Sequence, residues 1–185
     1  MSDGMLKILG IAGSLRRGSF NAAALRAAQE LAPAGMTIDI FDIASIPLYD
    51  EDVKVQGFPS AVADLRARIK AADGLLLATP EYNYSTSGVL KNAIDWASRP
   101  PEQPFDGKPI ALMGASGGAL GTARAQYHLR QMFIFLNAHL LNRPEVMIGG
   151  ATSKFDAEGK LTDQATRDLL GTMLTAFKVW IEKLR

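Results

Sequence analysis

The chain has no cysteine among its 185 residues and only two histidines. Without cysteine there is no disulfide, no thiolate nucleophile, no cysteine-bound iron–sulfur cluster and little scope for a structural zinc site. His128 and His139 have no clustered carboxylate partner at ligand spacing, so we expect no metal site. The composition therefore points away from thiol and metal chemistry.

The chain also lacks an excess of charge and a long apolar run. Its 20 lysines and arginines stand against 19 aspartates and glutamates, which leaves a net charge of +1. Such a weak field does not favour nucleic acid or a membrane surface as a partner. No apolar run reaches the roughly 20 residues of a membrane-spanning helix, and Met1–Met5 is too short and polar for a signal peptide. We expect a cytoplasmic protein.

What is present is a regular alternation of apolar runs and helical periodicity. With 48% hydrophobic residues, the chain suits one compact domain over residues 1–185. Segment 42–58 is polar and predicts a surface loop, and Ser60 is expected to cap the helix that follows it. The predicted strands are 6–11, 37–41, 74–78, 109–113 and 145–148, and the predicted helices are 22–31, 60–72, 88–98, 122–136 and 163–184.

Five strands with intervening helices predict an α/β fold built on a doubly wound, five-stranded parallel sheet. Right-handed crossovers place helices on both faces of such a sheet. Its ligands bind outside the carboxyl ends of the strands, near the point where strand order reverses. If the order is 2-1-3-4-5, the turns after the first, third and fourth strands converge on one edge. These turns are residues 13–21, 79–87 and 114–121.

The first of these turns is rich in glycine and serine and leads directly into a helix. That arrangement presents backbone N–H groups to an anion. Its hydroxyl, amide and guanidinium side chains can bind a terminal phosphate. They are Ser14, Arg16, Arg17, Ser19 and Asn21. Taken alone, the turn is explained equally well as an ordinary connection with a capping serine.

Two common nucleotide motifs are absent from this turn. Gly13 and Gly18 have the spacing of a Walker A loop, but Ser19 stands where its lysine belongs. The glycines are also spaced wrongly for the Gly-x-Gly-x-x-Gly dinucleotide fingerprint. A phosphomonoester that carries a flat group, such as FMN, fits better.

The other two turns suit a planar ligand. Thr79–Ser87 is polar and aromatic, so its backbone can hydrogen-bond the edge of a flavin ring while Tyr82 or Tyr84 packs nearby. Gly114–Gly121 carries so little side chain that a flat ring can lie against its backbone. Each turn alone can be a plain loop, but three at one edge favour a binding site.

These residues carry a family resemblance. Gly-Ser-Leu-Arg-x-x-Ser-x-Asn at 13–21, Pro-Glu-Tyr-Asn-Tyr-Ser at 80–85 and Gly-Val-Leu-Lys-Asn-Ala-Ile-Asp-Trp at 88–96 resemble the NAD(P)H-dependent FMN reductase family. This flavodoxin-like group includes bacterial quinone and chromate reductases. The similarity extends from Leu6 to about Ile148. One departure is Ser87, where family members often have proline, and a serine there can cap the helix.

The resemblance implies non-covalently bound FMN and the residues that hold it. The implied phosphate contacts are Ser14, Arg16, Ser19 and Asn21, with Phe20 also among the cofactor-binding residues. The implied ring contacts are Pro80, Glu81, Tyr82, Asn83, Tyr84, Ser85, Ser116, Gly117 and Gly118. No catalytic acid or base is expected from the chain, and Glu81 and Tyr82 are better explained as positioning or subunit-contact residues.

The chemistry implied is a ping-pong cycle in which NAD(P)H, as co-substrate, reduces the flavin and an acceptor reoxidises it. Quinones are the expected acceptors, with chromate, azo compounds and free flavin as further candidates. The wide apolar surface of helix 122–136 suggests burial on two sides, and the resemblance implies a homodimer or homotetramer. The alternative is a flavodoxin-type electron carrier. Such carriers tend to be strongly acidic, so the near-neutral charge favours the enzyme.

Overall fold

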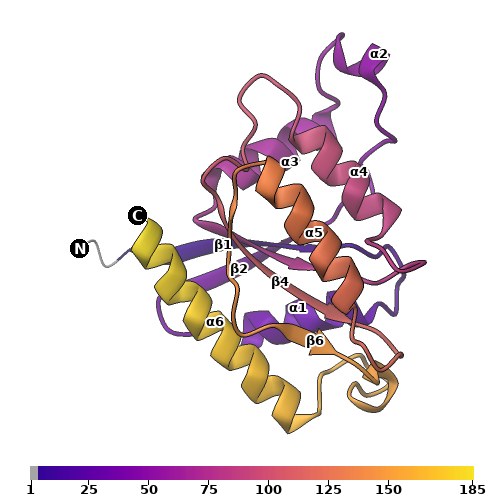
Figure 1. Cartoon of the computed structure of the whole chain (residues 1–185), viewed down its shortest axis with the longest axis vertical. Helices are drawn as coiled ribbons and strands as arrows, with labels where there is room; N and C mark the ends of the chain where they lie inside the picture. The colour runs from indigo at the N-terminus through magenta and orange to yellow at the C-terminus, as the bar shows by residue number, and fades with distance from the viewer. Residues whose placement is uncertain (1–3) are drawn as a thin grey trace.

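A parallel β-sheet runs through the middle of the molecule (Figure 1). The structure is a computed structural model and describes residues 4–185. Along the sheet the strand order is β2-β1-β3-β4-β5, so the predicted order is confirmed. Strand β6 pairs with the last residues of β4, whereas β5 pairs with the first residues of β4. The strands are β1 Leu6–Ala12, β2 Met36–Phe41, β3 Gly74–Ala78, β4 Pro109–Ala115, β5 His139–Leu140 and β6 Val146–Ile148.

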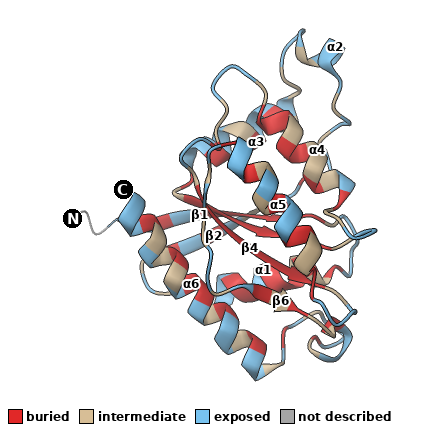
Figure 2. Cartoon of the chain, in the orientation of Figure 1, coloured by how far each residue is buried: buried red, intermediate tan, exposed pale blue. Residues whose placement is uncertain are grey.

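Helices cover both faces of the sheet, as predicted. The helices are α1 Phe20–Glu30, α2 Glu51–Lys54, α3 Ser60–Ala71, α4 Gly88–Ala97, α5 Ala123–Phe135, α6 Gln164–Leu184 and the short 3-10 helix η1 Ala151–Ser153. Helices α1 and α6 pack on one face and α3, α4 and α5 on the other (Figure 1). Because both faces are covered, every residue of β3 and β4 is buried (Figure 2).

Three short elements were not predicted, namely β5, α2 and η1. The fifth position in the sheet is divided, because β5 pairs with Pro109 and Ile110 whereas β6 pairs with Met113–Ala115. Only the second half was expected, since the two residues of β5 are too few to show a pattern. Helix α2 lies inside the segment predicted as a loop, and its four residues span barely one turn.

The two serines expected to cap helices behave differently. Ser87 accepts a hydrogen bond from the backbone N–H of Leu90 at 3.3 Å and caps α4, as predicted. The cap predicted for Ser60 is wrong, because Pro59 holds the cap position of α3 and makes no side-chain bond. Proline fixes a backbone angle that suits this entry into a helix, and it places Ser60 inside the first turn.

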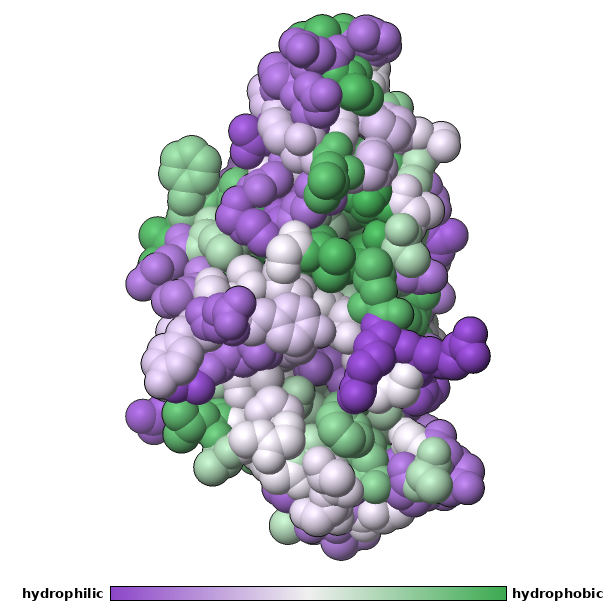
Figure 3. Space-filling model, turned by 90° about the vertical axis from the view of Figure 1, so that its right-hand side faces the viewer, coloured by the Kyte–Doolittle hydropathy of each residue, from purple (hydrophilic) through white to green (hydrophobic). Residues whose placement is uncertain are grey.

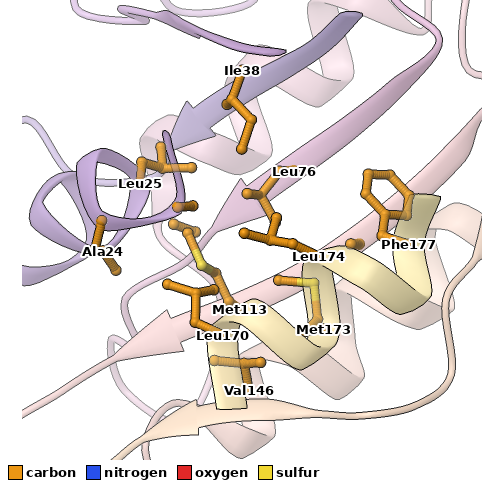
Figure 4. Close-up of a cluster of buried hydrophobic side chains, with 14 of the residues drawn as sticks. Ala24, Leu25, Ile38, Leu76, Met113, Val146, Leu170, Met173, Leu174 and Phe177 are labelled. Carbon is orange, nitrogen blue, oxygen red and sulfur yellow. The ribbon is translucent and has the colours of Figure 1, made fainter. Parts of the chain in front are cut away.

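One half of the core lies between the sheet and helices α1 and α6 (Figure 4). Leu174 and Phe177 on α6 reach in toward Leu76 and Met113 on the central strands, and all four are buried. The helical periodicity of the C-terminal segment is thereby confirmed. Within residues 4–185, no helix combines the length and the apolar character that crossing a bilayer demands.

The core predicts a contrast between two leucines of α6. Leu174 is fully buried, so we expect Leu174→Ala to lower the free energy of unfolding by about 2–5 kcal/mol through lost burial and a cavity. Leu169 is 37% exposed, and the same substitution there should cost about 1 kcal/mol or less. Urea unfolding of both variants measures the difference, and equal losses would contradict this description of the α6 packing.

Candidate functional site

The three predicted turns lie together at the carboxyl edge of the sheet. Each begins with a hydrogen bond to a neighbouring strand. The Gly13 N–H donates to Ala78 O at 2.8 Å, and the Thr79 N–H donates to Met113 O at 2.9 Å. The Ser116 N–H donates to a carbonyl at the end of β6, 3.0 Å away. Figure 3 faces this side of the molecule and shows hydrophilic and hydrophobic surface side by side. The convergence expected from the strand order is confirmed.

The first turn places the N-terminus of α1 at this edge. Ser19 is buried and caps the helix by accepting from the Ala22 N–H at 3.2 Å, which leaves its own O–H free to donate. Within residues 4–185, the N–H groups of Phe20 and Asn21 have no protein acceptor, as expected in a first helical turn. Arg16 is exposed, with its guanidinium 5.4 Å from the Phe20 ring centroid. Free donors and a cation make this turn suitable for an anion.

Asn21 connects the first turn to the third. Its buried amide forms two hydrogen bonds with the backbone of Ala115, accepting from the N–H at 2.9 Å and donating to the carbonyl at 3.0 Å. The family resemblance implies a phosphate contact for Asn21, and the sequence gives no sign of this connection to Ala115. A direct contact between its side chain and a phosphate stays a prediction. The observed bonds make Asn21 a brace between the two turns.

The glycines of the third turn are of two kinds. Gly114 and Gly121 are required by the protein itself, because an added Cβ would overlap Thr122 at Gly114 and the backbone of Met147 at Gly121. Gly117 and Gly118 are exposed, and an added Cβ would find its nearest protein atom at 3.5 and 3.6 Å, respectively. Neither packing nor backbone angle requires glycine at these two positions. A backbone without side chains there leaves room for a flat group to approach.

The second turn forms a tight hairpin that displays two tyrosines. Tyr82 and Ser85 exchange backbone hydrogen bonds of 3.0 Å in both directions. Asn83 and Tyr84 between them have positive φ angles of 48° and 66°, as in the turns that favour tight hairpins. The tyrosine side chains are 52% and 69% exposed, respectively. Pro80, just before the hairpin, is buried.

Glu81 does not extend into open solvent beside these tyrosines. Its carboxylate accepts from the backbone N–H groups of Arg124 at 3.1 Å and Ala125 at 3.4 Å, and it pairs with the Arg124 guanidinium. Burial raises the pKa of Glu81, but the bonds from Arg124 and Ala125 outweigh it and leave the pKa below its ordinary value. Glu81 is therefore a carboxylate at neutral pH. Arg124 was not among the predicted site residues.

Comparison with known proteins agrees with this geometry. The family model described as NADPH-dependent FMN reductase matches residues 6–153. The chain belongs to the NADPH-dependent FMN reductase family. It is 61% identical over 185 residues to an NAD(P)H-dependent FMN reductase of Pseudomonas aeruginosa, with 100% of both chains covered. It is 48% identical over 183 residues to a quinone reductase of Escherichia coli, with 97% of each covered.

A solved structure gives the same result for the fold. The flavoenzyme NAD(P)H:(acceptor) oxidoreductase FerB of Paracoccus denitrificans superposes with a TM-score of 0.88 at 36% identity. The match covers 96% of this chain and 98% of that one. The flavodoxin-like architecture and the family assignment are therefore confirmed.

Among residues 4–185 no three histidine, aspartate or glutamate side chains gather as a metal site would need.

We expect substitution of the two kinds of glycine to cause different defects in this protein. We expect Gly117→Ala to raise the dissociation constant for FMN about tenfold by placing a methyl group where the flavin ring is predicted to lie, with little change in apo-protein stability. Gly121→Ala should instead destabilise the apo-protein, because its Cβ has no space and its φ is +54°. Flavin fluorescence titration and thermal unfolding measure both effects. Wild-type FMN affinity in Gly117→Ala would place the ring elsewhere.

Proposed function

We propose that this protein is an FMN-dependent oxidoreductase that accepts electrons from NAD(P)H and passes them to quinones. The observation that carries the proposal is the N-terminus of α1, with free N–H groups, braced by Asn21 against a glycine turn that has room for a ring. A phosphate beside one turn and a planar group against the other describe FMN. Family membership supports the same conclusion.

The residues present fit the two ends of FMN. We assign the phosphate to the Ser14, Arg16 and Ser19 side chains and to the free N–H groups of Phe20 and Asn21. Arg16 supplies charge, and Ser19 still has its hydroxyl proton to donate. The ring lies between the hairpin and the glycine turn, and the residues assigned to it are Pro80, the backbone of Glu81, Tyr82, Asn83, Tyr84, Ser85, Ser116, Gly117 and Gly118.

Bound FMN supplies the hydride chemistry, and the chain supplies position and access. The backbone of the two turns fixes one side of the site, and the exposed tyrosines of the hairpin flank it. No side chain is assigned as a catalytic acid or base. Such an open, largely backbone-lined site suits flat acceptors, and the quinone reductase relative supports quinones. Chromate is proposed as a second acceptor. We also propose that the protein is cytoplasmic.

An electron carrier of the flavodoxin type is the second candidate. It shares the FMN site but exchanges electrons with protein partners, for which carriers use a strongly charged docking surface. The net charge of +1 does not favour a strongly charged docking surface. The enzyme is therefore the better proposal.

The first test is the reaction with NADPH. We expect the FMN-loaded protein to lose its flavin absorbance on anaerobic addition of NADPH and to recover it when benzoquinone is added. Stopped-flow absorbance measures both half-reactions, and Arg16→Ala should weaken FMN binding about tenfold by removing a charged phosphate contact. A flavin that stays oxidised with both NADPH and NADH would favour the carrier.

A homodimer or homotetramer is also part of the proposal. The outer side of α5 carries three large hydrophobic residues, Tyr127, Ile134 and Phe135, that are 48%, 75% and 86% exposed. Large apolar side chains gathered on one exposed helix are typical of a covered interface. A second copy of the chain is the proposed cover.

The oligomer can be tested by charge insertion. We expect the native chain to sediment as a dimer or tetramer and Phe135→Asp to shift it toward the monomer, because a carboxylate would be buried unpaired. Leu48→Asp, at a residue that is 85% exposed near α2, is the control. A monomeric native protein in analytical ultracentrifugation would rule out the interface.

A further inference from the structure

The start of α5 has no cap of its own. The cap residue Thr122 has a φ of +72°, and its side chain accepts no hydrogen bond from a backbone N–H of the helix. The backbone N–H groups of Arg124 and Ala125, in the first turn, are instead bound by Glu81 at 3.1 and 3.4 Å. Glu81 belongs to the turn after β3, 43 residues earlier in the chain. A carboxylate from one flavin-facing turn therefore caps the helix that follows the other.

The Arg124 side chain also binds the Glu81 carboxylate, and we call these two residues the Glu81–Arg124 clamp. The Arg124 Nε donates to Glu81 Oε1 at 2.5 Å, and a second guanidinium nitrogen contacts the same oxygen. The Glu81 side chain is only 9% exposed. The same guanidinium lies 3.7 Å from the centroid of the Tyr84 ring, a cation–π contact. One turn further along α5, His128 Nδ1 lies 2.9 Å from Ser85 Oγ.

The hairpin needs these contacts because its backbone is held in a costly conformation. Asn83 and Tyr84 are not glycines, yet both have positive φ angles. Such residues persist where surrounding contacts hold them. The tyrosines of the hairpin are more than half exposed, so burial contributes little to holding it. Helix α5 supplies the restraint at Glu81, Tyr84 and Ser85.

We propose that Glu81 and Arg124 are positioning residues that hold the Tyr82–Ser85 hairpin in its flavin-binding shape, and that the Glu81 carboxylate is not itself a flavin ligand. The effect of these contacts on FMN binding rests on the proposed function, whereas the contacts themselves do not. A hairpin already fixed in the apo-protein spares FMN the entropy cost of ordering it on binding. The clamp also keeps the Arg124 charge neutralised beside the site.

The experiment compares the apo-protein and the FMN-loaded protein for Glu81→Gln and Arg124→Met. Glu182→Gln, an exposed carboxylate in the last turn of α6, is the matched control. Hydrogen–deuterium exchange of apo-protein peptides reports the Tyr82 and Ser85 amides, which form the hairpin hydrogen bonds. Fluorescence titration gives the FMN dissociation constant, and spectroelectrochemistry gives the midpoint potential.

In Glu81→Gln we expect about tenfold faster exchange in the hairpin, unchanged exchange in β3 and about a tenfold rise in the FMN dissociation constant. The midpoint potential should become more positive, because the unpaired Arg124 cation favours reduced, anionic flavin. Arg124→Met leaves the Glu81 cap on the backbone N–H groups. It should loosen the hairpin without the positive shift in potential, and it tests the clamp if Glu81→Gln fails to fold.

Two results would overturn the proposal. Wild-type hairpin exchange in both variants would show that the clamp does not hold the hairpin. Weaker FMN binding in Glu81→Gln with unchanged apo-protein exchange would make the carboxylate a direct ligand. Failure of the proposed function can be distinguished from failure of this inference. A native protein that binds no FMN would disprove the proposed function, but exchange in the apo-protein would still test the clamp.

Discussion

The candidate site depends most on one buried interaction, the pair of hydrogen bonds between the Asn21 amide and the backbone of Ala115. Asn21 stands at the start of α1 and Ala115 at the end of β4, so the pair fixes the turn after β1 relative to the glycine turn after β4. Both backbone groups of Ala115 are satisfied by one side chain in a buried position. Loss of the amide would leave these groups unpaired away from water, which proteins avoid. Only a side chain with both a donor and an acceptor at this reach can do this.

The rest of the site is made mainly of backbone. Free N–H groups at α1, the exposed backbone of Gly117 and Gly118 and the hairpin after Pro80 present few reactive side chains. This is consistent with a protein whose cofactor supplies the chemistry. It also explains why the sequence shows no catalytic acid or base although family membership is clear.

The architecture and the place of the site could be predicted because both follow from local patterns. Apolar runs predict buried strands, and parallel strands bring their carboxyl ends to one edge, so the three turns had to meet. The bonds that hold those turns together could not be predicted. Asn21 and Ala115 are 94 residues apart in the chain, and Glu81 and Arg124 are 43 apart. No periodicity or motif encodes such pairs, and β5 is too short to show a pattern.

Helix α5 links the candidate site to the exposed apolar side chains proposed as a subunit interface. Near its start Arg124 and His128 contact the hairpin, and near its end Ile134 and Phe135 extend into solvent. A packed helix moves as a unit, because its side chains interlock with the core and its backbone bonds are internal. Covering the outer side of α5 would therefore also restrain the start of the helix, where Glu81 is bound. Assembly and flavin binding would then favour each other by the same reduction in conformational freedom.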